Sequence, residues 1–196
     1  MQSSKYIVAD IGGTNARFAS VNSATCHLAN VQVFPCAEFP FLLQAIEAYI
    51  DSQDTSVLEA VCLAVAGPVD TDPIDLPNNH WSFRREELER SLGIPVKVIN
   101  DFSAQVLSIA NLESTELRRL GSARPKGQGV TAVIGPGTGL GVSALMPSGD
   151  ILPSEAGHVG FAPADSHQSD LLEVLRKRYR RISAERILSG PGLANL

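Results

Sequence analysis

The sequence contains few cysteines, few basic residues and no long apolar run. Its three cysteines, Cys26, Cys36 and Cys62, are odd in number and lack the paired spacing of metal ligands. They predict reduced thiols in a cytoplasmic protein and argue against a framework of disulfides. No apolar run approaches the roughly 18 residues that span a bilayer, and no basic segment followed by an apolar one opens the chain. We therefore expect neither membrane insertion nor export.

The shortage of positive charge argues against a further class of protein. Lys and Arg number 16 against 21 Asp and Glu, which gives a net charge of −5. Proteins that bind nucleic-acid backbones carry many clustered basic side chains, so we expect no nucleic-acid partner. The one basic run, Arg176 to Arg181, fits a solvated helix face or helix end. With 44% hydrophobic residues over 196 positions, the chain can form one or two globular domains.

The stretch that organises the chain is YIVADIGGTNARF, Tyr6 to Phe18. A short apolar run delivers Asp10 to a turn built on Gly12 and Gly13, where bare backbone N–H groups can bind phosphate oxygens. Asp10 could hold a magnesium ion, directly or through water, because hard divalent cations favour carboxylates and phosphates together. A tight β-hairpin is the alternative interpretation, since glycine adopts positive φ at little steric cost.

A second glycine cluster, IGPGTGLGV at Ile134 to Val142, is also entered from an apolar run. Two such turns, each between two strands, predict a nucleotide that is held from two sides. The repeated order of strand, glycine turn and strand suggests two related lobes that face one cleft. Residues 113–128 carry charge, Gly and Pro, and we expect them to connect the lobes.

The remaining pattern predicts an α/β fold. Strands at 5–9 and 16–21 flank the first glycine turn and should form an antiparallel pair. The apolar run 58–66 fits a strand covered on both faces, which is typical of helix-flanked sheets, and an irregular strand over 69–76 follows it. The other elements predicted are strands at 31–34, 96–99, 130–135 and 140–146, and helices at 41–53, 84–92, 102–112 and 170–179.

Two polar segments follow predicted strands in the first part of the chain. LPNNHWSF, Leu76 to Phe83, holds the single tryptophan, which we interpret as a packing anchor, although Asn, Asn and His together are unusual for a linker. Asn100 and Asp101 end the strand 96–99 just before a helix. Capping of the free N–H groups of that helix is the alternative to a role in catalysis.

Two carboxylates and a histidine stand out in the second part of the chain. Glu155 and His158 lie in the Gly-rich segment ILPSEAGHVGFAP. Glu185 lies near a predicted helix start, where Ser183 and the residues after it can instead form a capping arrangement.

These motifs resemble the bacterial glucokinase family of the hexokinase, heat-shock ATPase and actin superfamily. The resemblance extends over essentially the whole chain: ADIGGTNAR, LAVAGPV, NNHW, INDF, GPGTGLGV, EAGHVGFAP and SAERILSGPGL stand in the family's order. The first motif and the GTGLG loop are shared by many sugar kinases, whereas NNHW, EAGHVGFAP and SAERILSGPGL look particular to this family.

The fold implied by the resemblance is α/β, a ribonuclease-H-like (actin-like ATPase) two-lobe fold with mixed sheets flanked by helices. Residues 1–112 would form the small lobe, with the first phosphate loop and the catalytic aspartate. Residues 113–196 would form the first part of a large lobe, which is incomplete. The activity implied is ATP-dependent phosphorylation of glucose at its 6-hydroxyl, the first step of glucose use in glycolysis, with magnesium. The partners implied are glucose, ATP and, optionally, a second copy in a homodimer.

The resemblance also assigns roles to single residues. Asp101 matches the catalytic base beside the primary hydroxyl of the sugar. The positions that match sugar ligands are Asn100, Asp101, Gly137, Glu155, His158 and Glu185. The positions that match the phosphate loops are Ala9, Asp10, Ile11, Gly12, Gly13, Thr14, Gly137, Thr138 and Gly139, with Asp10 as the magnesium residue.

The family continues well beyond the SGPGLANL segment in which this chain ends. The resemblance therefore implies that the adenosine-binding segment and the closing helices of both lobes lie outside residues 1–196. We expect this stretch alone to phosphorylate glucose poorly or not at all.

Two other classes of protein share part of the pattern. Kinase-like sugar-sensing regulators normally carry a DNA-binding segment ahead of the Asp10 motif, and nucleotide-driven chaperones or filament proteins have no need for the sugar ligands.

Overall fold

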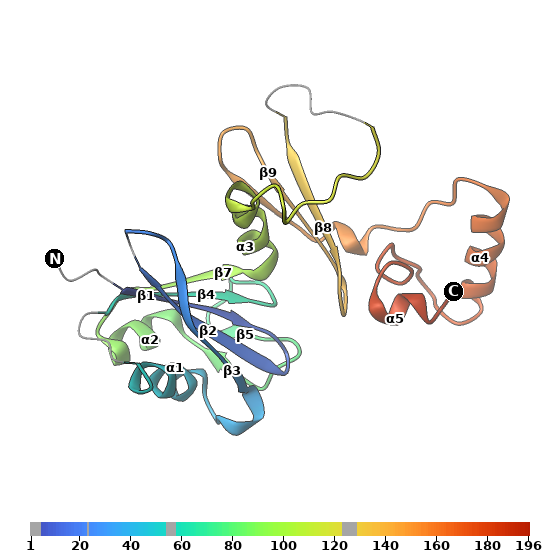
Figure 1. Cartoon of the computed structure of the whole chain (residues 1–196). Helices are drawn as coiled ribbons and strands as arrows, with labels where there is room; N and C mark the ends of the chain where they lie inside the picture. Colours follow the sequence, from blue (N-terminus) through green and yellow to red (C-terminus); the bar gives the residue numbers. More distant parts are fainter. Residues whose placement is uncertain (1–4, 23, 54–57, 123–128) are drawn as a thin grey trace. The chain divides into compact units, whose positions relative to one another are not determined.

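The computed structural model of the protein describes residues 5–22, 24–53, 58–122 and 129–196 (Figure 1). The chain splits into two compact units, Met1–Ala104 and Gln105–Leu196. The sequence pattern predicts a boundary after residue 112, whereas this division falls inside the helix α3, Asp101–Ser108. Part of the expected connection, residues 123–128, lies outside the described residues.

The first unit is built on a mixed five-stranded sheet in the order β3-β2-β1-β4-β7. The central strand β1, Lys5–Ile11, pairs antiparallel with β2, Asn15–Asn22, which pairs antiparallel with β3, Leu28–Pro35. On its other side β1 pairs parallel with β4, Leu58–Val65, which pairs parallel with β7, Val96–Asn100. The antiparallel first pair and the mixed sheet confirm the expectation from the sequence.

Helix α1, Leu42–Asp51, packs against this sheet (Figure 1). Its apolar residues recur at helical spacing, and Leu42, Ala45, Ile46 and Tyr49 are each at most 2% exposed. They share one core cluster with the alternate β1 and β4 residues that face the same side of the sheet. Each fully buried aliphatic or aromatic side chain contributes about 1.5–3 kcal/mol to this packing.

Helix α2, Arg85–Leu92, ends as the sequence predicts. Gly93 takes the left-handed conformation, φ 69°, and its N–H donates to the Glu89 carbonyl at 2.9 Å. The buried Leu88 joins the same core cluster as α1.

Strand β4 differs from the expectation that both of its faces are covered. Val61, Leu63 and Val65 on one face are fully buried, whereas Cys62 and Ala64 on the other are only partly buried. Within the described residues, the sheet is therefore well covered on one face only.

The irregular strand expected at 69–76 is reduced to β5, Ile74–Asp75, paired with β6, Ser82–Phe83. The chain between them turns through the NNHW motif. Trp81 is 2% exposed and donates from Nε1 to the Phe39 carbonyl at 2.8 Å, which confirms its role as a packing anchor. The short 3-10 helix η1, Cys36–Glu38, precedes Phe39.

In the second unit the 3-10 helix η2, Ile109–Asn111, follows the end of α3. The unit holds a three-stranded antiparallel sheet in the order β10-β9-β8. Its strands are β8, Thr131–Pro136, β9, Leu140–Leu145, and β10, Ile151–Ser154. The second glycine turn joins β8 to β9, so the predicted order of strand, glycine turn and strand is confirmed.

Two helices follow this sheet, α4, Ser166–Arg176, and α5, Gly190–Leu193, after the 3-10 helix η3, Ala156–His158. The helix predicted from 170 to 179 begins and ends earlier than expected. Asp165 sets the start, because its Oδ1 accepts the N–H of Gln168 at 2.8 Å as an N-cap. No helix in the described ranges has the length and apolar character that crossing a membrane demands.

Candidate active site

The carboxyl ends of three parallel strands bring two predicted sites to one edge of the first sheet. In the strand register, Ile11 of β1 lies opposite Val65 of β4, and Val65 lies opposite Asn100 of β7. The glycine turn after Ile11 and the pair formed by Asn100 and Asp101 therefore leave the sheet at the same edge. They are separated by two strand spacings, about 10 Å.

The first glycine turn leaves backbone donors free. The N–H of Gly12 is used inside the turn, where it donates to the Asn15 carbonyl at 2.9 Å. The N–H groups of Gly13 and Thr14 make no hydrogen bond to any described residue, and both residues are exposed. The turn is a hairpin, as the alternative interpretation has it, and it also offers two amides to an anion. The two interpretations are thus compatible.

Ala9, Asp10 and Ile11 deliver the chain to this turn. Ala9 and Ile11 are 5% and 0% exposed, so only their backbone can reach a ligand. The Asp10 side chain is 61% exposed, and its Oδ2 lies 3.5 Å from Nη1 of Arg17 on the neighbouring strand. An accessible carboxylate beside free amides suits a magnesium ion that is shared with phosphate oxygens.

In the part of the chain that the structure describes, no group of three or more His, Cys, Asp or Glu side chains is arranged so that it could hold a metal ion. This does not conflict with the role expected of Asp10. Magnesium in phosphate-transferring sites is typically held by only one or two carboxylates, with phosphate oxygens and water completing its octahedral shell.

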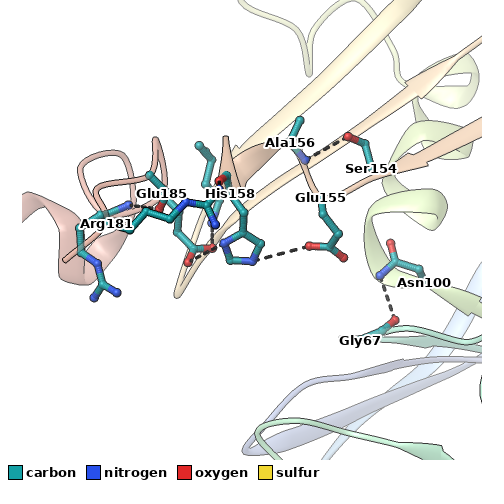
Figure 2. A network of polar contacts seen from close by, with 11 residues as sticks. Gly67, Asn100, Ser154, Glu155, Ala156, His158, Arg181 and Glu185 are labelled. Atoms are coloured by element: carbon teal, nitrogen blue, oxygen red, sulfur yellow. Dashed lines mark hydrogen bonds and ion pairs between the residues drawn. The ribbon is translucent and has the colours of Figure 1, made fainter. Parts of the chain in front are cut away.

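Asn100 caps helix α3, as the alternative interpretation predicts. Its Oδ1 accepts the N–H groups of Phe102 and Ser103 at 3.0 and 3.2 Å, and its Nδ2 donates to the Gly67 carbonyl at 3.1 Å (Figure 2). These contacts fix the side chain and the start of the helix. Most of the hydrogen-bonding capacity of Asn100 is therefore used within the protein.

Asp101 opens the same helix, and its Oδ1 accepts the N–H of Phe102 at 2.9 Å. Burial raises the pKa of this carboxyl above its ordinary value of 3.8. The bond from Phe102 opposes this rise in pKa, and the negative charge of Asp10 adds to it. Asp101 is thus both a helix-start residue and a carboxylate with increased proton affinity at the edge of the sheet.

In the second unit, His158 lies between two carboxylates (Figure 2). Its Nε2 is 3.7 Å from Glu155 Oε2 and its Nδ1 is 3.6 Å from Glu185 Oε1. Glu155 and His158 are close in the sequence, whereas Glu185 is far from both. The fold thus brings the three side chains together. The set offers charged acceptors and a ring that donates or accepts.

Backbone contacts fix this cluster. Glu185 Oε2 accepts the N–H of Leu140 at 3.0 Å, and the N–H of Glu185 donates to the Gly157 carbonyl at 2.9 Å. A Cβ on Gly157 would collide with the Leu140 carbonyl, so only glycine fits there. Arg181 donates from Nη2 to the His158 carbonyl at 2.6 Å (Figure 2).

The expectation that Glu185 lies near a helix start is wrong. It lies in a turn that precedes the short α5, and the N–H of Arg186 donates to Ser183 Oγ at 3.3 Å. The capping arrangement expected at Ser183 is therefore present, but it closes a turn instead of a helix.

The second glycine turn is closed at Gly137, whose N–H donates to the Gly139 carbonyl at 2.8 Å. The Gly137 carbonyl accepts the N–H of Gly190 at 2.7 Å. Among the described residues, the N–H groups of Thr138 and Gly139 have no partner, so these two amides are the ones available to a phosphate.

Sequence reasoning missed two residues that support these sites, Asn79 and Arg181. Asn79 bonds the first glycine turn, and Arg181 bonds the backbone of His158. The unusual polarity of the NNHW segment could have indicated a role for Asn79. Nothing in the sequence distinguishes Arg181, because it is one of several basic residues in the run that ends there.

A model of the glucokinase family, described as "Glucokinase", matches residues 7–196. A glucokinase of Chromohalobacter salexigens is 41% identical over 194 residues, which are 97% of this chain and 61% of the relative. A glucokinase of Hahella chejuensis is also 41% identical, over 97% of this chain and 60% of its own length. The chain therefore spans about 60% of the length of the curated relatives that it matches.

Solved structures give the same result. The crystal structure of a glucokinase from an Antarctic psychrotroph superimposes with a TM-score of 0.81 at 33% identity, over 97% of this chain and 62% of that chain. The glucokinase of Balamuthia mandrillaris, solved in complex with glucose, has a TM-score of 0.68 at 25% identity and covers 98% of this chain and 61% of its own.

Proposed function

The chain belongs to the glucokinase family, and from this premise we propose that the whole protein transfers the γ-phosphoryl group of ATP to the 6-hydroxyl of glucose. This is the first step of glucose use in glycolysis. Relatives named glucokinase match almost the whole chain, which favours the kinase over a sugar-sensing regulator or a nucleotide-driven chaperone.

One observation carries the proposal. Asp101 and the first glycine turn stand at the same edge of one sheet, about two strand spacings apart. A sugar hydroxyl that bonds Asp101 and a phosphate that bonds the free amides of Gly13 and Thr14 would then share one site. Phosphoryl transfer requires mainly this kind of alignment, together with neutralisation of charge.

Asp101 would act as the base that accepts the proton of the attacking hydroxyl. Burial raises its pKa, and this increases its affinity for that proton. General base catalysis of this kind typically contributes about 10²- to 10⁴-fold to the rate.

The other proposed sugar ligands are Asn100, Gly137, Glu155, His158 and Glu185. Glucose offers only hydroxyl groups, so recognition needs protein donors and acceptors in fixed positions. Glu185 meets this need because its carboxylate accepts the N–H of Leu140, and Arg181 fixes the backbone of His158 by donating to its carbonyl. A sugar that lacks one hydroxyl would leave such a group unpaired and would be rejected.

The free amides of Gly13, Thr14, Thr138 and Gly139 would bind phosphate oxygens of the nucleotide. The Asp10 carboxylate, directly or through water, would hold the magnesium ion that neutralises negative charge on these phosphates. Arg17, 3.5 Å from Asp10, would keep that carboxylate oriented when no metal is bound.

We include in the proposal a cytoplasmic location and the capacity to form a homodimer. Support for the location comes from the three cysteines, which are all free thiols. Size-exclusion chromatography with light scattering tests the dimer.

The activity is tested by measuring glucose 6-phosphate formation with full-length protein, ATP, magnesium and glucose. Asp101→Ala should lower kcat by about 10²-fold or more, because the base is lost. Asp51→Ala, which removes an exposed carboxylate at the end of α1, is the matched control and should retain full activity. Unchanged turnover in Asp101→Ala would leave Asp101 with the role of a helix-start residue alone. Residues 1–196 by themselves should show little or no turnover.

A further inference from the structure

The NNHW turn lies directly against the first glycine turn, although the two are far apart in the sequence. Asn79 donates from Nδ2 to the Gly12 carbonyl at 3.0 Å. A Cβ built on Gly13 would lie 2.8 Å from the carbonyl oxygen of Asn78, closer than real Cβ atoms approach. The close fit explains why glycine is required at Gly13 and shows that the two turns pack as one unit.

Asn79 is itself held in place. Its Oδ1 accepts the N–H of Trp81 at 3.1 Å, and its own N–H donates to the Leu76 carbonyl at 3.1 Å. Trp81 is buried and bonded to the Phe39 carbonyl. The side-chain amide of Asn79 therefore has one orientation, with its NH2 group directed at Gly12.

Cys36, which lies in a third segment of the chain, also contacts the glycine turn. Its N–H donates to the Thr14 carbonyl at 2.8 Å, and its buried thiol lies 3.8 Å from the Gly12 carbonyl oxygen, within reach of a weak S–H bond. The Gly12 and Thr14 carbonyls are thus directed towards Asn79 and Cys36.

The geometry of the peptide bond gives these contacts a consequence for phosphate binding. A peptide unit is planar and trans, so the carbonyl of one residue and the N–H of the next point in opposite directions. When Asn79 fixes the Gly12 carbonyl, it also fixes the N–H of Gly13 on the opposite side. That N–H is one of the two free amides of the turn.

We propose that Asn79 is a positioning residue for the nucleotide: its bond to the Gly12 carbonyl aims the Gly13 N–H at a phosphate oxygen. The inference rests on the proposed function of the turn. Asn79 acts through Gly12 and need not touch the nucleotide.

Asn79→Asp in the full-length protein isolates the donated bond. The aspartate keeps the size of the side chain and an acceptor for Trp81, but it turns an oxygen towards the Gly12 carbonyl and repels it. Gln44→Glu is the control for charge, because it adds the same charge by the same amide-to-carboxylate change at an exposed position of α1, away from the glycine turn. Asn79→Ala removes the donor without adding charge.

The KM for ATP should rise about 10-fold in both Asn79 variants, as expected for a charge-assisted phosphate contact that is misaligned. The KM for glucose and the glucose affinity measured by calorimetry without nucleotide should change less than about 2-fold. Gln44→Glu should keep the wild-type KM for ATP within the same limit.

The inference is overturned if the wild-type protein phosphorylates glucose and the Asn79 variants keep its KM for ATP. It is equally overturned if both KM values rise together or if both variants are unfolded at the assay temperature, because Asn79 would then serve general stability. Failure of the proposed function itself would look different. The wild-type protein would not phosphorylate glucose, and calorimetric titration with ATP would still test Asn79.

Discussion

Glu185 accepts the N–H of Leu140 on its Oε2 at 3.0 Å, and this bond ties a proposed sugar ligand to the end of the second glycine turn. The other oxygen, Oε1, lies 3.6 Å from His158 Nδ1. One carboxylate thus joins the sugar cluster to the turn that would bind phosphate. Displacement of either partner should therefore change the KM for both glucose and ATP.

Gly139→Ala tests this link. A Cβ at this position would lie 2.6 Å from Glu185 Oε2, so the carboxylate must move and its bond to Leu140 is lost. We expect the KM for glucose to rise about 10-fold or more, since a shift of about 1 Å in a site can cost 10²-fold. Steady-state kinetics of the full-length protein measures the change. Gly129→Ala is the control, because a Cβ there meets nothing within 4 Å, and it should behave as wild type.

Arg181→Ala tests the support of His158. Loss of the 2.6 Å bond to the His158 carbonyl should loosen the loop and raise the KM for glucose about 3- to 10-fold, with a smaller change in the KM for ATP. Arg180→Ala removes the same charge from the neighbouring exposed position and should leave both values unchanged. An equal effect of the two variants on the KM for glucose would indicate that charge, and not the bond, is responsible.

Asp101→Asn should stabilise the folded protein near neutral pH while it abolishes activity. The folded-state pKa of Asp101 is raised above 3.8 by burial, so the ionised carboxylate costs stability once the pH exceeds that raised pKa. Below 3.8 the group is protonated in both states and the cost disappears. Thermal unfolding should therefore show a higher Tm at pH 7.5, and this gain should shrink as the pH falls.

Glu47→Gln, which makes the same chemical change on the exposed face of α1, is the control and should not reproduce this pH dependence. A loss of stability in Asp101→Asn at pH 7.5 would refute the prediction.

The cysteines should differ in their reactivity in the folded protein. Cys26 is exposed, whereas Cys36 is 2% exposed and burial raises the pKa of its thiol. Burial also raises the pKa of Cys62, and Lys97 partly opposes it. With iodoacetamide at pH 8, mass spectrometry should find Cys26 alkylated about 10-fold faster than Cys36. In denaturant the thiols should react alike, and rapid labelling of Cys36 before unfolding would contradict its position behind the glycine turn.

Much of the first unit could be predicted because its signals are local. Two glycines after an apolar strand gave the hairpin at Gly12 and Gly13, and the polar pair Asn100 and Asp101 gave the capped start of α3. The limits of α4 were missed, since its start depends on the side chain of Asp165, which accepts the Gln168 N–H. The helix start expected near Glu185 is not formed, for a related reason. Its segment is held by bonds to Gly157 and Leu140, which are made in the tertiary structure.

The residue types and their order by themselves determined the family of the chain, the glycine turns and the identity of the candidate ligands. These follow from backbone conformation and side-chain chemistry, which each residue carries with it. Only the tertiary structure decided which N–H groups are free and what orients them. That Gly137 uses its N–H inside the turn, and that Asn79 fixes Gly12 from a distant segment, depends on distances across the fold. No local pattern encodes such distances, because hydrogen bonds between distant segments form only once the intervening chain has folded.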